Sequence, residues 1–140
     1  TGVALCREAG IRTFLYFVIG LPWESAETVR QTIDLAKELD GDYYEFHLAY
    51  PFPKTELHQI AFAEGLTDDK LIEEGTYANP AMRTFHLSRR ELAQWRRRAL
   101  LEVYFRPAYL RRLVANINSL GELVNYLKFG VRGVFAMFRG

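Results

Sequence analysis

The order of apolar and polar positions predicts one β-α-β unit in the first half of the chain. Residues 11–19 (IRTFLYFVI) are almost continuously apolar, which is typical of a parallel strand covered on both faces. A helix should follow, because apolar residues then recur at the spacing of one helix face (Val29, Ile33, Ala36 and Leu39). Residues 43–50 (YYEFHLAY) predict a second strand, and the crossover between two parallel strands should be right-handed.

Shorter elements are expected on either side of this unit. Gly10 lies where a left-handed residue would end a helix before the first strand. Residues 55–64 predict a short helix that ends at Gly65. The stretch 66–83 is expected to be irregular, apart from a short helix near 68–74, and 82–87 (MRTFHL) predicts a short edge strand.

The second half of the chain predicts helices. Ser88 and Glu91 have the spacing of a capping box, and Leu87 with Leu92 has that of a hydrophobic staple. The helix they open should run to about residue 105 and break at Pro107. Two more helices are expected, over 108–117 and, from a second capping box at Ser119 and Glu122, over 119–127.

Composition narrows the class of protein. The chain has 140 residues, of which 49% are hydrophobic and 14% aromatic, and this excludes a disordered tail. Its one cysteine, Cys6, excludes an intramolecular disulfide and a self-contained thiolate zinc site or iron–sulfur site, and we expect it to be a small core residue. No apolar run approaches the ~18–20 residues of a transmembrane helix, and no secretory signal opens the chain. A cytoplasmic protein is therefore expected.

The net charge of +1 hides a division between the two halves. Residues 1–85 hold 7 Lys+Arg against 14 Asp+Glu, a net −7, whereas residues 86–140 hold 11 against 3, a net +8. This division favours two parts that attract each other over a dedicated surface for phosphates or anionic lipid. The run Arg96-Arg97-Arg98 beside Trp95 is expected to be a solvated helix face rather than a nucleic-acid contact.

The ends of the two predicted strands are where a ligand would bind. Ligands of α/β sheets and barrels lie at the carboxyl ends of parallel strands, which here are the turn 20–24 (GLPWE) and the segment 51–55 (PFPKT). Gly20 would let a ligand approach the backbone, although Gly and Pro also make a tight turn with no ligand at all. Glu24 and Glu45 could meet near these ends, although Glu45 is expected to face a helix.

The three histidines carry no metal-ligand spacing. His47, His58 and His86 are far apart in the sequence, so none of them belongs to a pattern such as HxxxH. We expect His47 to make a hydrogen bond in the core or between strands. The sequence therefore predicts no metal ligands.

Together, these segments resemble the second half of the barrel in radical S-adenosylmethionine (SAM) enzymes. The resemblance rests on the run 10–25, which contains FVIGLPWES, on TIDLA at 32–36, and on Pro51, Pro53, Thr55 and Leu57. The resemblance is closest to enzymes with an N-terminal cobalamin-binding domain. Residues 77–109 resemble the C-terminal extension of those enzymes. The implied fold is α/β: the C-terminal half of a partial (β/α) TIM-like radical SAM barrel, followed by a helical C-terminal extension. The pattern departs at Tyr16, Trp23 and Lys54, where the family often has glycine.

The resemblance implies six residues for SAM binding and leaves the catalytic residues unknown. In the family the first of these strands lays its backbone along the adenine of SAM, which implies Val18, Ile19 and Gly20 here. The tip of the next strand would flank the same pocket with Ala49, Tyr50 and Pro51.

The family's CxxxCxxC loop, which holds a four-iron–four-sulfur cluster, is absent from this chain. The resemblance therefore implies a C-terminal fragment of a longer enzyme, inactive alone, whose missing N-terminal half supplies the cluster and, in part of the family, cobalamin. Residues 1–65 would be the partial barrel, 66–87 an irregular connection and 88–140 a basic helical extension. The substrate would be a small, hydrophobic or isoprenoid-like molecule.

Other partners stay open from the sequence. An alternative function is a non-catalytic interaction module whose basic C-terminal helices bind an anionic membrane or RNA, with 123–140 as the membrane-contacting segment. A parallel sheet outside its barrel would expose a strand edge and an apolar face, so the chain is expected to dimerise.

Overall fold

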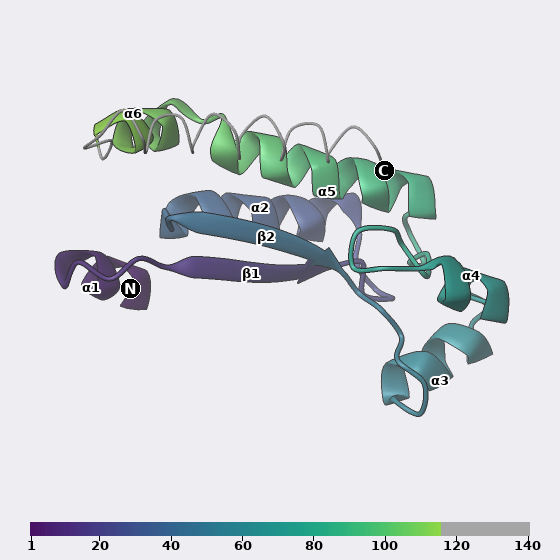
Figure 1. The fold of residues 1–140 in the computed structure, drawn as a ribbon. Helices are drawn as coiled ribbons and strands as arrows, with labels where there is room; N and C mark the ends of the chain where they lie inside the picture. Colours follow the sequence, from purple (N-terminus) through teal and green to yellow (C-terminus); the bar gives the residue numbers. More distant parts are fainter. Residues whose placement is uncertain (116–140) are drawn as a thin grey trace. The chain divides into compact units, whose positions relative to one another are not determined.

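A computed structural model of the chain describes residues 1–115, which hold two strands and six helices (Figure 1). The chain divides into two compact units, 1–103 and 104–140. In chain order the elements are α1 (Gly2–Glu8), β1 (Phe14–Ile19), α2 (Ala26–Leu39), β2 (Tyr43–Leu48), α3 (Glu56–Ala63), α4 (Asp69–Glu74), α5 (Arg89–Tyr104) and α6 (Pro107–Ala115).

The first unit contains the expected β-α-β arrangement. Strands β1 and β2 pair in parallel, in register from Phe14 opposite Tyr43 to Ile19 opposite Leu48. The first strand begins at Phe14 rather than at residue 11. The amide of Thr13 donates to the Asp42 carboxylate at 2.8 Å instead of pairing with the backbone of β2. Both strands point toward the end of the unit where α3 and α4 lie (Figure 1).

Helix α2 forms where the apolar spacing predicted it. Ser25 caps its start through a reciprocal pair of hydrogen bonds with Thr28, and Asp40 ends it in the left-handed conformation at φ 52°. Three residues of the predicted face, Val29, Ile33 and Ala36, are buried against the sheet. Tyr44, Phe46 and Leu48 of β2 and Ile19 of β1 complete this core.

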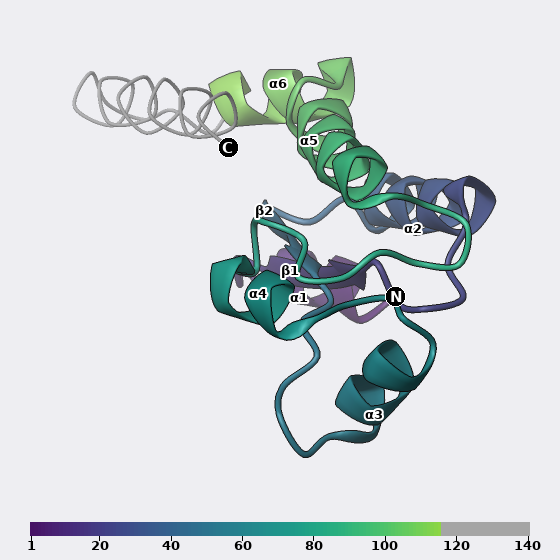
Figure 2. The ribbon, with the colours of Figure 1, turned by 90° about the vertical axis from the view of Figure 1, so that its right-hand side faces the viewer.

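Helices α2 and α5 lie next to each other on this face of the sheet (Figures 1 and 2). The buried positions of α5 are Leu92, Ala99, Leu100 and Val103. Its start has the predicted capping box: the Glu91 carboxylate accepts from the amide of Ser88 at 2.8 Å, and the amide of Glu91 donates to the hydroxyl of Ser88. It ends at Tyr104, shortly before Pro107, as expected.

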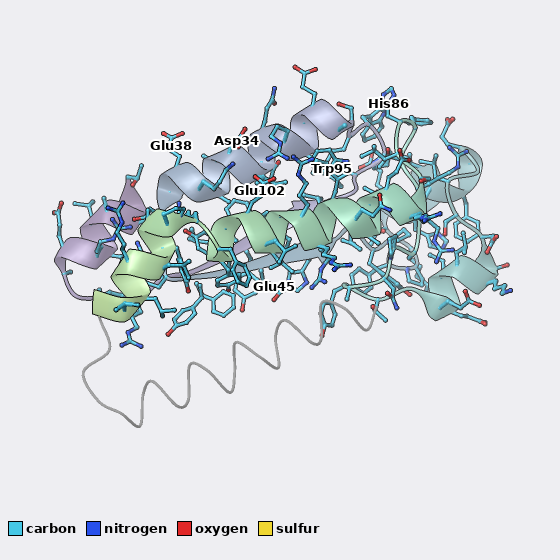
Figure 3. All side chains as sticks on the ribbon, turned by 90° about the horizontal axis from the view of Figure 1, so that it is seen from above. Asp34, Glu38, Glu45, His86, Trp95 and Glu102 are labelled. Atoms are coloured by element: carbon cyan, nitrogen blue, oxygen red, sulfur yellow. The ribbon has the colours of Figure 1, made fainter. Side chains whose placement is uncertain are left out.

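A cluster of charged residues joins α2 to α5. Glu102 of α5 accepts hydrogen bonds from Arg30 at 2.7 and 3.0 Å and from Lys37 at 3.1 Å. Arg98 adds a third cation at 2.8 Å. The guanidinium groups of Arg30 and Arg98 both lie over the Trp95 ring, 5.2 and 5.1 Å from its centroid. Figure 3 shows Trp95 and Glu102 where the two helices face each other.

The opposite face of β1 is exposed, which corrects the expectation of a strand covered on both faces. Phe14, Tyr16 and Val18 are 51, 66 and 54% exposed. Helices α2 and α5 cover the other face of the sheet, so half of the apolar run has no cover within the described part of the first unit.

The expected edge strand over 82–87 is wrong. This segment bends, because the buried Thr84 side chain binds its own neighbours: its hydroxyl accepts from the amides of His86 and Leu87 and donates to the carbonyl of Glu24. The short helices predicted before it are confirmed as α3 and α4, and Gly10 and Gly65 have the left-handed φ expected of helix ends.

The described part of the second unit is α6 with its flanking residues. The rings of Tyr104 and Tyr109 meet edge to face at 5.3 Å, and the Arg112 guanidinium lies over the Tyr109 ring. Three predicted segments lie outside the described residues: the helix over 119–127, the end of the helix over 108–117, and the membrane-contacting segment 123–140. Within residues 1–115, no helix is long and apolar enough to cross a membrane.

Candidate functional site

A hollow of about 590 Å³ lies at the carboxyl ends of β1 and β2. This volume is in the range of small-molecule sites, about 300–1,000 Å³. The strands contribute Val18, Leu48 and the adjoining Ala49 to its wall, and Leu21 comes from the turn after β1. The hollow therefore occupies the place where ligands bind in parallel α/β folds.

The turn after β1 is held closed by its own carboxylate. Glu24 accepts hydrogen bonds from the amides of Gly20 and Leu21, the second at 3.0 Å. Gly20 has a φ of 91°, a conformation that favours glycine. The carbonyl of Glu24 in turn accepts from the Thr84 hydroxyl at 2.8 Å. The two amides are thus bound within the protein, and a ligand at this turn would meet carbonyl groups and side chains.

Aromatic side chains form the outer part of the hollow. The Tyr50 hydroxyl donates to the carbonyl of Ile72 at 2.9 Å, and its ring lies 4.8 Å from that of Phe52. The segment holding Tyr77 is attached to the strand, because the amide of Leu48 donates to the carbonyl of Tyr77 at 2.9 Å. Tyr77 itself is 61% exposed. Leu57 and Thr76 complete the lining.

His47 is the histidine of this wall. Its ring is flanked by Tyr77 at 5.3 Å and by Tyr16 at 5.7 Å, measured between ring centroids. Its Nε2 atom is buried and has no hydrogen-bond partner among the described residues. The hydrogen bond that the sequence predicted for His47 is therefore not made at this nitrogen.

The six residues implied by the resemblance lie together at the strand ends but do not all reach the hollow. Val18, Ala49 and Tyr50 line it. Ile19, Gly20 and Pro51 are buried behind that wall. The amide of Ala49 donates to the carbonyl of Ile19 at 2.8 Å, which continues the pairing of the strands to the edge of the hollow.

Glu24 and Glu45, which could have met at the strand ends, do not. Glu45 faces α5, where its carboxylate accepts from Arg96 at 2.7 Å, and the same guanidinium donates to the carbonyl of Phe46. Arg98 binds Glu102. These two arginines of the basic run therefore hold carboxylates of this chain, and Figure 3 shows Glu45 beside α5.

No described residues form a metal centre. Within residues 1–115, no three His, Cys, Asp or Glu side chains are grouped to bind a metal ion. Cys6 is half-buried, and α1 has no fully buried residue, so the expectation that this cysteine belongs to the core is wrong.

Several lining residues were missed by reasoning from the sequence. Tyr77 and Thr76 come from a stretch with no periodic pattern, so only a three-dimensional arrangement could place them beside β2. Phe52 lies in the segment 51–55, which the sequence placed at the ligand-binding end of the strands, and Leu57 just beyond it could have been found by the same signal.

Comparison with known proteins adds one relative. No family model matches the chain. The chain is 33% identical over 108 residues, 77% of its length, to an uncharacterized methyltransferase of Pyrococcus horikoshii. It spans about a quarter (24%) of that protein's length. Most of this chain is thus similar to one segment of a protein described as a methyltransferase.

Proposed function

We propose that this chain forms part of a SAM-dependent methyltransferase, and that the hollow at the ends of β1 and β2 belongs to its SAM and substrate site. The observation that carries the proposal is the alignment of 77% of this chain, at 33% identity, with a protein described as a methyltransferase. The position of the hollow supports it, because α/β proteins bind ligands at this end of parallel strands. The adenine of SAM would lie against Val18, Ala49 and Tyr50, which line the hollow.

The finer proposal is a radical SAM enzyme, with this segment as the second half of its barrel. The strand and turn sequence through FVIGLPWES and the parallel pairing of β1 with β2 support it. The chain itself does not fit an iron–sulfur cluster, because it has one cysteine and its described part groups no metal ligands. The cluster ligands, and cobalamin if the enzyme uses it, would be supplied by residues outside this sequence.

Product analysis on the protein made from the complete gene tests both the methyltransferase proposal and the radical SAM proposal. The protein is purified without oxygen and incubated with SAM and a reductant. Formation of 5′-deoxyadenosine, together with binding of S-adenosylhomocysteine measured separately, would support a radical SAM methyltransferase. S-adenosylhomocysteine binding without any 5′-deoxyadenosine would keep the methyltransferase and overturn the radical mechanism. Neither binding nor cleavage of SAM would overturn both.

A further inference from the structure

The wall of the hollow combines an apolar lining with one buried nitrogen that lacks a partner. Its aliphatic members include Val18, Leu21 and Leu57, and its aromatic members are Tyr50, Phe52 and Tyr77. The Nε2 of His47 is buried in this setting with no hydrogen-bond partner among the described residues. Native proteins pair nearly all such groups, so an unpaired one calls for an explanation.

Leaving this nitrogen unpaired destabilises the free protein. A buried polar atom without a partner loses its bonds to water and gains none in return. A ligand that supplied the missing hydrogen bond would recover this loss, and a ligand without such a group would not. Enzyme sites reject analogues lacking a polar group by the same effect.

We propose that His47 is the polar anchor of the hollow, and that the hollow takes a largely apolar molecule carrying one hydrogen-bonding group. The imidazole is positioned for this role by β2, whose neighbouring residues Phe46 and Leu48 are buried in the core. A neutral imidazole can either donate or accept at Nε2, so the group on the ligand is a hydroxyl, carbonyl or ring nitrogen.

Tyr77 is the nearer of the two tyrosine rings that flank the His47 imidazole. Its ring packs against the imidazole at 5.3 Å, while 61% of the residue is exposed. The backbone of Tyr77 is fixed by the amide of Leu48, but the exposed ring is free of any bond that would hold it in place in the described structure. In this proposal, a ligand reaches Nε2 once the Tyr77 ring rotates toward solvent.

The proposed function gives this molecule its role, and the inference about its role rests on that function. In a methyltransferase whose SAM lies along the strand ends, a molecule held between His47 and the aromatic wall is the methyl acceptor. The chemistry of the bound molecule does not depend on that assignment, because it follows from the lining and from His47 alone.

Two matched fluorescent probes, 2-naphthol and naphthalene, test the anchor on the protein made from the complete gene. They share one apolar body and differ in one hydroxyl. We expect 2-naphthol to bind about fivefold more tightly to the wild type, which is the effect of roughly one net hydrogen bond. His47→Phe should remove this preference, and His47→Gln, which keeps a hydrogen-bonding group, should retain most of it. His86→Phe is the matched control, because His86 is exposed and lies outside the lining.

The preference between the two probes is a readout that loss of packing alone would not change, because packing losses weaken both probes together. Equal binding of the probes to the wild type, a preference that survives His47→Phe, or binding of neither probe would each overturn the proposal. If circular dichroism shows that His47→Phe does not fold, carbethoxylation of the wild type decides. Saturating 2-naphthol should protect His47 and leave His86 reactive, and equal reactivity of His47 with and without 2-naphthol would overturn the anchor.

S-adenosylhomocysteine binding to the same variants separates this inference from the proposed function. If the wild type discriminates between the probes but does not bind S-adenosylhomocysteine, the anchor stands and the methyltransferase proposal fails. If S-adenosylhomocysteine binds and the probes are not distinguished, the proposed function stands and the anchor fails.

Discussion

At the scale of single residues, Glu102 collects three cations on one carboxylate. The hydrogen bonds from Arg30, with those from Arg98 and Lys37, outweigh partial burial and lower the pKa of Glu102 to about 2. A carboxylate whose folded pKa lies below its unfolded pKa of about 4.5 stabilises the fold at neutral pH. This contribution is complete above the unfolded pKa and is lost as the pH falls from about 4.5 to about 2.

Glu102→Gln should therefore lower the free energy of unfolding at pH 7 by about 2 kcal/mol. It should also flatten the decline of stability between about pH 5 and pH 2, because the group that titrates there is gone. Urea unfolding at a series of pH values measures both effects. Glu38→Gln is the matched control, since Glu38 is an exposed residue of α2 outside this cluster (Figure 3), and it should change stability by less than about 0.5 kcal/mol. Parallel pH profiles for wild type and Glu102→Gln would contradict the account.

Thr84 holds the turn after β1 to the start of α5 through one buried hydroxyl. Thr84→Val keeps the shape of the side chain but leaves the amide of Leu87 and the carbonyl of Glu24 without this partner. We expect a loss of about 1–3 kcal/mol in the free energy of unfolding, measured by urea titration. The same substitution at Thr32, whose hydroxyl bonds only within α2, should cost much less. Equal losses at the two sites would show that the Thr84 bonds add nothing.

Single residues also mark where reasoning from the sequence ends. The capping residue Ser88 was predicted correctly, because a cap depends on neighbours three residues away. Whether the side chains of His47 and Thr84 find hydrogen-bond partners depends on residues distant in the sequence or on competition between local partners. No spacing rule could show that one would lack a partner at Nε2 and that the other would bend the expected edge strand.

At the scale of elements, the segment after α4 is fixed by a close backbone approach. A Cβ atom added at Gly75 would lie 2.8 Å from the Cα of Ala81 and 2.9 Å from the carbonyl oxygen of Leu71. Backbone on both sides leaves no side chain that could move aside. Glycine is therefore required at this position by space, since its φ of −74° is open to any residue.

Gly75→Ala should displace the segment that carries Thr76 and Tyr77, and so deform the hollow. We expect a loss of about 1–3 kcal/mol in stability, typical of overpacking, with weaker binding of both naphthalene probes. Thermal unfolding and fluorescence titration measure the two effects. Gly2→Ala is the control, because nothing lies within 4 Å of a Cβ at Gly2. Unchanged probe binding in Gly75→Ala would mean that this segment does not shape the hollow.

The elements themselves were largely predictable, whereas their cover was not. The strands, α2 and α5 follow from apolar spacing and from caps, both of which are local properties. Whether the second face of β1 is covered depends on what packs over it, and in the described part of the first unit Phe14, Tyr16 and Val18 stay exposed. Apolar content predicts that a face of the strand will be buried, but it does not show which element buries it.

At the scale of the whole molecule, β1 presents both an exposed apolar face and an edge that pairs with no strand in residues 1–115. Edges and faces of this kind favour association with another strand. The 140-residue chain should therefore self-associate, with an average mass in sedimentation equilibrium that rises with concentration. Tyr16→Lys places a charge on this face, where the Tyr16 side chain is 66% exposed, and should shift the chain toward monomer. A wild type that stays monomeric at all concentrations would contradict this prediction.

Photolabelling of the complete gene product with 8-azido-SAM would show whether SAM binds at the carboxyl ends of β1 and β2, as we propose. After irradiation and proteolysis, we expect label on the peptides that contain Val18 and Tyr50, and unlabelled SAM should abolish the labelling. If specific label is confined to other peptides, or if SAM competes away no labelling, SAM does not bind at these strand ends.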